Sequence, residues 1–347
     1  MIQKNSTRDY LFDNIKGLLL ILVVFGHAIE YVIYHSTGIL KYIYTAIYIF
    51  HMPVFLYISG YFSKKFNFKR ILSLLITYIL WQSFIFPLSL AILTEKSFQE
   101  IYRPLYFPQI SYWYLLAIVI WRIITPLFSK LKYALPISIL LSLTFGFLNL
   151  NFNLQFFTVG RLFVFYPFFL AGFYSTQNTI DKFTRKNKYM YSILFFIIIS
   201  LTTILIHYVG KYGVNPERMN RILMPHYSYA QCYTNTILAF TIKSILLLVG
   251  FIAIPLLFSL SPSKNSILSN IGKNSLIIYL SHMIFIETIR INYLSKLEFK
   301  TAFTFGIIAC LVSILYCIVL SNNKISNFLS ATLTVNIKTT DKTQKNA

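Results

Sequence analysis

The chain has 347 residues, 56% of them hydrophobic and only 12% charged, with a formal net charge of +21. Soluble domains are about 45–50% apolar and about 25% charged, so this composition excludes an ordinary soluble protein and indicates a membrane protein. Repeated runs of about 20 apolar residues favour spanning helices over a β-barrel, whose strands alternate apolar and polar residues. The basic residues lie in short segments between these runs. They are therefore expected to set orientation and to face anionic lipids, and no nucleic-acid partner is expected.

In chain order, we predict an all-α, polytopic membrane bundle of about ten spans with both termini cytoplasmic. The predicted spans cover residues 15–34, 40–62, 70–93, 111–129, 133–150, 161–177, 190–209, 235–259, 273–291 and 301–321. Lysine and arginine concentrate in alternate loops, among them 64–70 and 181–188, and the positive-inside rule places these loops in the cytoplasm. We expect residues 1–321 to form a single membrane-embedded domain and residues 322–347 a polar cytoplasmic tail.

The first predicted span carries a stripe of ionisable side chains. Lys16 and His27 are eleven residues apart, which is three helical turns plus roughly 20°, so they share one face and lie about 16 Å apart along the axis. Asp13 and Glu30 fall within roughly 60° of the same line. A charge at the centre of a bilayer costs at least ~2.5 kcal/mol, so these side chains are expected to face the bundle interior or a wet cavity.

Each residue of this stripe has a plain interpretation beside a functional one. His27 could form an interhelical hydrogen bond, or it could act as a base or proton relay near neutral pH. Glu30 could orient the imidazole or lie at the interface as an ordinary charge. Lys16 taken alone would be a snorkelling anchor at the inner membrane surface.

The segment LFDNIKGLLLILVVFGH resembles the signature of the membrane acyltransferase-3 family, in which a basic residue is followed after ten positions by histidine. Here the pair is Lys16 and His27. The Asp-x-x-Lys-Gly form of residues 13–17 resembles the fucose 4-O-acetylase-like branch of that family. Four further stretches, residues 50–65, 112–122, 167–174 and 271–282, resemble later helices of the family in the same order.

The resemblance implies transfer of an acetyl group from cytoplasmic acetyl-CoA to a sugar hydroxyl of a cell-surface polysaccharide or its lipid-linked precursor, at the bacterial plasma membrane. It implies that His27 is catalytic, and we expect Glu30 and Asp13 to support it. Donor binding is expected from Lys16, Lys64, Lys65, Lys69 and Arg70, although the last four could be plain positive-inside anchors. Membrane lipids and polysaccharide-assembly proteins are the other expected partners.

Further residues are candidates for binding the acceptor. His282 is expected to line the cavity at a depth near that of His27, and the others have a plain alternative at the membrane edge. The candidates are Arg161, His282, His51 and Trp113. Lys243 lies in an apolar run and is expected to snorkel to the outer surface. No metal is expected, because the histidines are scattered and no HExxH motif occurs. The alternative function is a transporter of glycan precursors with a proton-relay histidine, although no repeated halves or paired broken helices are visible. The residues do not distinguish acetyl from succinyl transfer.

Overall fold

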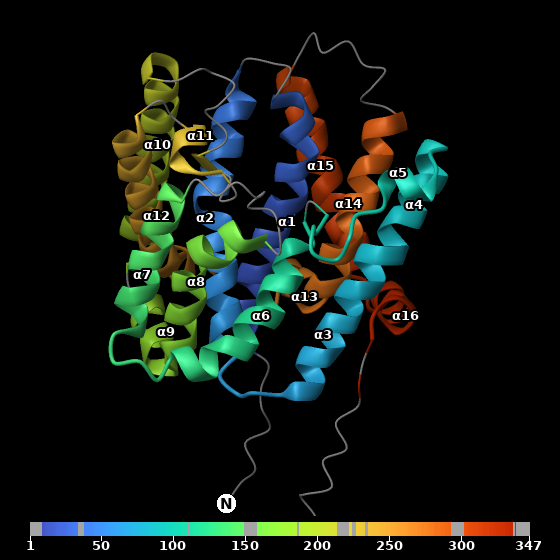
Figure 1. Cartoon of the computed structure of the whole chain (residues 1–347), viewed down its shortest axis with the longest axis horizontal. Helices are drawn as coiled ribbons and strands as arrows, with labels where there is room; N and C mark the ends of the chain where they lie inside the picture. Colours follow the sequence, from blue (N-terminus) through green and yellow to red (C-terminus); the bar gives the residue numbers. More distant parts are fainter. Residues whose placement is uncertain are drawn as a thin grey trace, which may run out of the picture.

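Figure 1 shows the computed structural model of the chain, which is a bundle of helices. The structure describes residues 9–33, 38–109, 111–148, 158–185, 187–213, 222–223, 227–232, 235–292, 302–335 and 337. Within these ranges the regular structure is helical and no strand occurs. The fold class predicted from the sequence, an all-α bundle with several helices suited to a membrane, is therefore confirmed.

Ten helical segments coincide with the ten predicted spans. They are α1 (Tyr10–Ile33), α2 (Ile39–Tyr61), the continuous segment α3 (Phe68–Leu80), η1 (Trp81–Ile85) and α4 (Phe86–Thr94), then α6 (Trp113–Phe128), α7 (Ala134–Thr144), α8 (Val159–Tyr174), α10 (Lys188–Gly213), α12 (Thr236–Leu260), α14 (Ser275–Asn292) and α15 (Ala302–Leu320). The shorter elements are α5 (Phe98–Ile101), η2 (Phe145–Phe147), α9 (Gln177–Thr184), α11 (Tyr229–Cys232), α13 (Ile267–Lys273) and α16 (Asn323–Leu333).

The number of spans stays a prediction. Among the described residues, five helices are long and apolar enough to cross a membrane, or six if the bent pair formed by residues 304–320 and 323–333 counts as one span. Helices α6, α7 and α8 have 16, 11 and 16 residues, which is shorter than the about 20 residues that a straight crossing needs. We call the end of the bundle at which α1 begins the inner end, following the orientation that the basic loops predict (Figure 1).

Glycines allow two pairs of helices to pack backbone against backbone. A Cβ atom on Gly17 would lie 2.0 Å from the Leu268 carbonyl oxygen, and one on Gly272 would lie 1.9 Å from that of Asp13, so α1 and α13 touch directly. Gly60 and Gly172 play the same part between α2 and α8. Small residues at helix contacts are typical of membrane bundles, where close van der Waals packing drives association. These contacts hold α1 and α2 in the centre of the molecule.

The first part of the segment predicted as a polar tail forms a helix packed on the bundle. Helix α16 turns by 79° from α15, and the Asn322 side chain caps its first turn by accepting a hydrogen bond from the Lys324 amide. The Trp81 indole donates a hydrogen bond of 2.8 Å to the Leu333 carbonyl. The apolar residues Leu329 and Leu333, which are four positions apart, pack against the buried core. Residue 336 and the tail beyond residue 337 lie outside the described residues.

Candidate functional site

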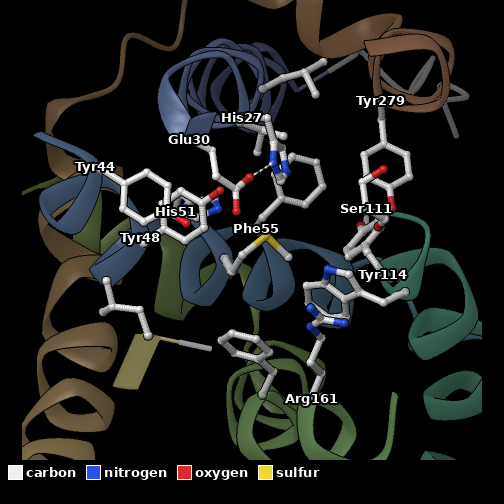
Figure 2. Close-up of a pocket in the computed structure, with 16 residues that line it drawn as sticks. His27, Glu30, Tyr44, Tyr48, His51, Phe55, Ser111, Tyr114, Arg161 and Tyr279 are labelled. Carbon is white, nitrogen blue, oxygen red and sulfur yellow. Dashed lines mark hydrogen bonds and ion pairs between the residues drawn. The ribbon is translucent and has the colours of Figure 1, made fainter. Parts of the chain in front are cut away.

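A cavity whose space of about 850 Å³ includes some open solvent lies between α1, α2, α6, α8 and α14. Helix α1 contributes Leu20, Val23, His27 and Glu30, whose spacing of three and four positions places them on one helix face. Figure 2 shows His27 and Glu30 on one side of the cavity and Arg161 on the opposite side. The imidazole that the sequence predicts to face the bundle interior therefore lines a cavity. We call this space the main cavity.

His27 and Glu30 form a hydrogen-bonded pair at the wall of the main cavity. The His27 Nδ1 atom lies 2.9 Å from the Glu30 Oε2 atom, and the two side chains are 16% and 25% exposed. A carboxylate only accepts hydrogen bonds, so Nδ1 carries the proton in the neutral ring. The Nε2 atom then keeps its lone pair and can accept a proton from a bound molecule. This arrangement is the one that a general base requires.

His282 does not line the main cavity, contrary to what the sequence suggested. Its side chain is fully buried behind His27, and the two ring centroids are 5.4 Å apart. Its Nδ1 atom donates a hydrogen bond to the Tyr279 carbonyl, which leaves the lone pair on Nε2. In the described part of the chain this buried Nε2 atom has no hydrogen-bond partner. The difference arises because the rotation of α14 turns the side chain toward α1 and away from the open space.

His51, Arg161 and Trp113 do line the main cavity, as the sequence suggested. His51 is the thirteenth of the 23 residues of α2, and its Nδ1 atom donates a hydrogen bond of 2.8 Å to the Ile47 carbonyl. The Arg161 guanidinium carbon lies 5.1 Å from the centroid of the Trp113 ring, so a cation–π contact holds it over the indole. Among the described ion pairs Arg161 has none, which leaves its fork of donors to a ligand.

Sequence reasoning missed Ser111, which precedes α6 and lines the main cavity. Its hydroxyl oxygen is buried and has no hydrogen-bond partner within the described structure, while its carbonyl accepts a hydrogen bond from the Tyr279 hydroxyl. A serine that precedes a helix beginning with aromatic residues is a common pattern, and it does not predict a functional site. Together with Arg161 it supplies donors that face His27 across the cavity.

Asp13 and Lys16 lie together below the main cavity, toward the inner end. The Lys16 ammonium is 2.7 Å from the Asp13 carboxylate, and Asp13 is buried. Asp13 is fourteen residues from His27, about 21 Å along the helix, so the structure does not bring it to the imidazole. Lys16 lies on the same helix face as Leu20 and His27, and its ammonium also lies 5.8 Å from the centroid of the Phe62 ring.

Basic side chains gather around the loop between α2 and α3 at the inner end. Lys64 donates a hydrogen bond to the Ser175 carbonyl and lies 4.1 Å from the Tyr61 ring centroid, and partial burial lowers the pKa of its ammonium. The other predicted donor-binding residues, Lys65, Lys69 and Arg70, lie on this loop and the first turn of α3. The structure adds Arg122, whose Nε atom donates a hydrogen bond of 3.1 Å to the Ser63 hydroxyl. It also interacts electrostatically with Arg70.

The bundle and its cavity define a membrane-embedded helical protein with a histidine–carboxylate pair at a buried site. A family profile described as an acyltransferase domain, acyltransferase 3, matches residues 9–322. The chain belongs to the acyltransferase-3 family.

Two curated proteins are similar to the chain, and both are named nodulation protein NolL. The one from Mesorhizobium japonicum is 30% identical over 189 residues, covering 50% of this chain and 49% of its own length. The one from Sinorhizobium fredii is 32% identical over 197 residues, covering 51% of each protein. The chain thus spans about half the length of the curated relatives it matches. No solved structure matches the chain.

Proposed function

We propose that this protein is a membrane O-acyltransferase that moves an acetyl group from cytoplasmic acetyl-CoA to a sugar hydroxyl of a cell-surface polysaccharide or its lipid-linked precursor. The observation that carries the proposal is the His27–Glu30 pair on the wall of a cavity inside the membrane-embedded bundle. Membership of the acyltransferase-3 family supports the reaction class. The fucose 4-O-acetylase-like form of residues 13–17 favours a sugar as the acceptor.

The residues of the main cavity fit the needs of acyl transfer to a hydroxyl group. The Nε2 atom of His27 takes the proton of the acceptor hydroxyl, while Glu30 holds the ring in position and stabilises the imidazolium that forms. The guanidinium of Arg161 and the hydroxyl of Ser111 are donors for the negative charge that develops on the carbonyl oxygen. The imidazolium then gives its proton to the departing thiolate, so that the site returns to its starting state.

The inner cluster of cations fits the other end of the donor. Acetyl-CoA supplies an activated thioester at the end of a long, flexible arm whose other end carries phosphates. Lys16, Lys64, Arg70 and Arg122 lie at the inner end and would hold those phosphates by charge-assisted hydrogen bonds. Asp13 is paired with Lys16 and would keep that ammonium in place. The predicted separation of about 16 Å between Lys16 and His27 leaves room for the arm between the two ends.

The test uses membranes that contain the protein together with the host glycan and labelled acetyl-CoA. We expect label on the glycan with the wild-type protein and at least about 100-fold less with His27→Ala, because a general base contributes about 10²–10⁴ to the rate. The matched control is His207→Ala, since His207 stacks on Tyr42 and bonds to Thr45 away from the main cavity. Equal transfer by His27→Ala would refute the role of His27. Movement of glycan precursor without label transfer would support the transporter instead.

A further inference from the structure

A second cavity with an empty volume of about 500 Å³ adjoins the main cavity. The two share three wall residues, Tyr48, Phe165 and Leu223. The second cavity extends from them between α2, α7, α8 and α12. We call it the side cavity.

Of the described residues that line the side cavity, Lys243 is the one that carries a charge. It is the eighth residue of α12, inside an apolar run, and the structure places it against this cavity, whereas the sequence suggested that it would snorkel to the outer surface. The Ser142 hydroxyl, also on the wall, donates to the Val164 carbonyl. The described residues offer the Lys243 ammonium no ion pair and no hydrogen bond.

An ammonium group in such surroundings is unfavourable unless an anion accompanies it. Leucine, isoleucine, valine, proline and phenylalanine make up most of the wall, so the cavity itself supplies little solvation. Charged residues inside membrane segments normally pair with one another or belong to a substrate path. None of the described residues that line the side cavity is a carboxylate, and the electrostatic neighbour of the Lys243 ammonium is the Cys232 thiol. An anionic ligand would therefore supply the counter-charge that the described wall lacks.

We propose that the side cavity is a binding site for an anionic group, a phosphate or carboxylate, carried by the acceptor, and that Lys243 is its counter-ion. The inference rests on the proposed function for the identity of the acceptor, because the side cavity shares wall residues with the main cavity that His27 lines. An acceptor held in this way places its neutral hydroxyl at His27 and its charge near α12. The substrate class is therefore an acidic saccharide or a saccharide linked to a lipid phosphate.

The apolar walls and the single cation together fit an amphiphilic anion. A phosphate that joins a sugar to a prenyl chain carries its charge beside hydrocarbon, and the side cavity has the same arrangement. A sugar carboxylate offers the same hydrogen-bond acceptors without the chain. The shared chemistry is one charged group with at least two oxygen atoms, which an ammonium binds by charge-assisted hydrogen bonds.

The experiment measures direct binding, so its result does not depend on acyl transfer. Purified full-length protein in nanodiscs of neutral phosphatidylcholine is titrated with citronellyl phosphate, a short prenyl phosphate, and separately with p-nitrophenyl β-D-glucuronide. Citronellol and p-nitrophenyl β-D-glucoside are the uncharged counterparts. The variants are Lys243→Met and Lys243→Arg. Lys41→Met is the matched control, because Lys41 lies at the outer end of α2 and lines neither cavity.

We expect saturable binding of at least one anion by the wild-type protein, weakened at least about tenfold by Lys243→Met. Lys243→Arg keeps the charge and is expected to remain within about threefold of wild type, as is Lys41→Met. Binding of the prenyl phosphate alone identifies a lipid-linked acceptor, and binding of the glucuronide alone identifies an acidic sugar. Binding that is equal for charged and uncharged probes, or unaffected by Lys243→Met, would overturn the proposal.

Two further measurements separate a loss of anion binding from misfolding of the variant and from failure of the proposed function. Lys243→Met removes a half-buried charge from an apolar wall, so its thermal unfolding midpoint is expected to equal or exceed that of the wild type. A lower midpoint would instead assign Lys243 a structural role and would count against the proposal. If the wild-type protein binds the anion but transfers no labelled acetyl group, the acyltransferase reaction is refuted and the proposal of an anion site is still supported.

Discussion

The His27 Nδ1 atom and the Glu30 Oε2 atom lie 2.9 Å apart on successive turns of α1, at the wall of the main cavity. Glu30→Gln keeps the size of the side chain and an acceptor oxygen but removes the charge that stabilises the imidazolium. We expect kcat for acetyl transfer to fall about 10- to 100-fold, with the KM for acetyl-CoA unchanged because the inner cations are untouched. Initial rates over a range of acetyl-CoA concentrations measure both quantities.

The control for this change is Glu100→Gln, which makes the same substitution on the short helix α5, away from the cavity. Glu100 hydrogen-bonds to Ser97 in a local capping box, so its loss is expected to leave the rate within about twofold. Full retention of kcat by Glu30→Gln would show that Glu30 is an interfacial charge without a part in the reaction.

The His282 ring lies beside the His27 ring, and its Nε2 atom has no hydrogen-bond partner among the described residues. A neutral lone pair next to His27 would favour the imidazolium of the proposed proton transfer, so replacing His282 distinguishes a part in catalysis from a part in packing. His282→Phe fills the space and removes the lone pair, so we expect kcat to fall about tenfold while the thermal unfolding midpoint holds or rises. His282→Asn restores an acceptor oxygen and is expected to recover part of the rate. A lower midpoint with unchanged kcat would assign the residue to packing alone.

Arg161 faces Glu30 across the main cavity, and within the described part of the chain its guanidinium forms no ion pair or hydrogen bond (Figure 2). Removing one donor from an oxyanion site typically costs about 10²–10³ in rate, so Arg161→Met is expected to lower kcat/KM for the acceptor about 100-fold. Arg161→Lys keeps the charge but loses the planar fork, and an intermediate loss of about tenfold is expected. The control is Arg103→Met, an exposed residue between α5 and α6. Equal rates for all of these proteins would exclude Arg161 from the site.

Replacing Arg122 tests the inner cluster of cations and leaves the residues that line the main cavity unchanged. If this cluster holds the phosphates of acetyl-CoA, Arg122→Gln raises the KM for acetyl-CoA about 5- to 20-fold and leaves kcat nearly unchanged, because the lost contact is made in both the ground state and the transition state. Lys130→Gln, at an exposed position just after α6, is the control. An unchanged KM, measured at low and at moderate ionic strength, would place the donor elsewhere.

The positions of the helices and the stripe on α1 were predictable, because both depend on local patterns. Runs of apolar residues set the spans, and the eleven-residue spacing of Lys16 and His27 set their common face. The rotation of one helix against another was not predictable. Apolar residues cover the lipid-facing and the core-facing sides of these helices alike, so hydropathy does not tell which way His282 or Lys243 turns. For the same reason hydropathy could not predict that Ser111 lines the same cavity as His27.

The close contact between α2 and α8 provides a prediction about stability, because α2 and α8 carry His51 and Arg161. A Cβ atom on Gly172 would lie 1.9 Å from the Tyr57 carbonyl oxygen, a backbone atom that cannot move alone. Gly172→Ala is therefore expected to separate the helices, at a cost of about 1–3 kcal/mol that appears as a lower thermal unfolding midpoint in detergent.

Gly306→Ala is the control for this change. Its new Cβ atom would meet the Leu40 Cδ2 atom at 2.5 Å, and that side-chain end can rotate away. We expect a smaller loss of stability for Gly306→Ala than for Gly172→Ala, since only a side chain has to adjust. If both variants unfold at the wild-type midpoint, α2 and α8 can move apart without loss of stability. The backbone contact at Gly172 then does not fix the position of the site residues on these helices. If only Gly172→Ala is destabilised, and its transfer rate per folded molecule falls with it, the packing of α2 on α8 sets the distance across the main cavity.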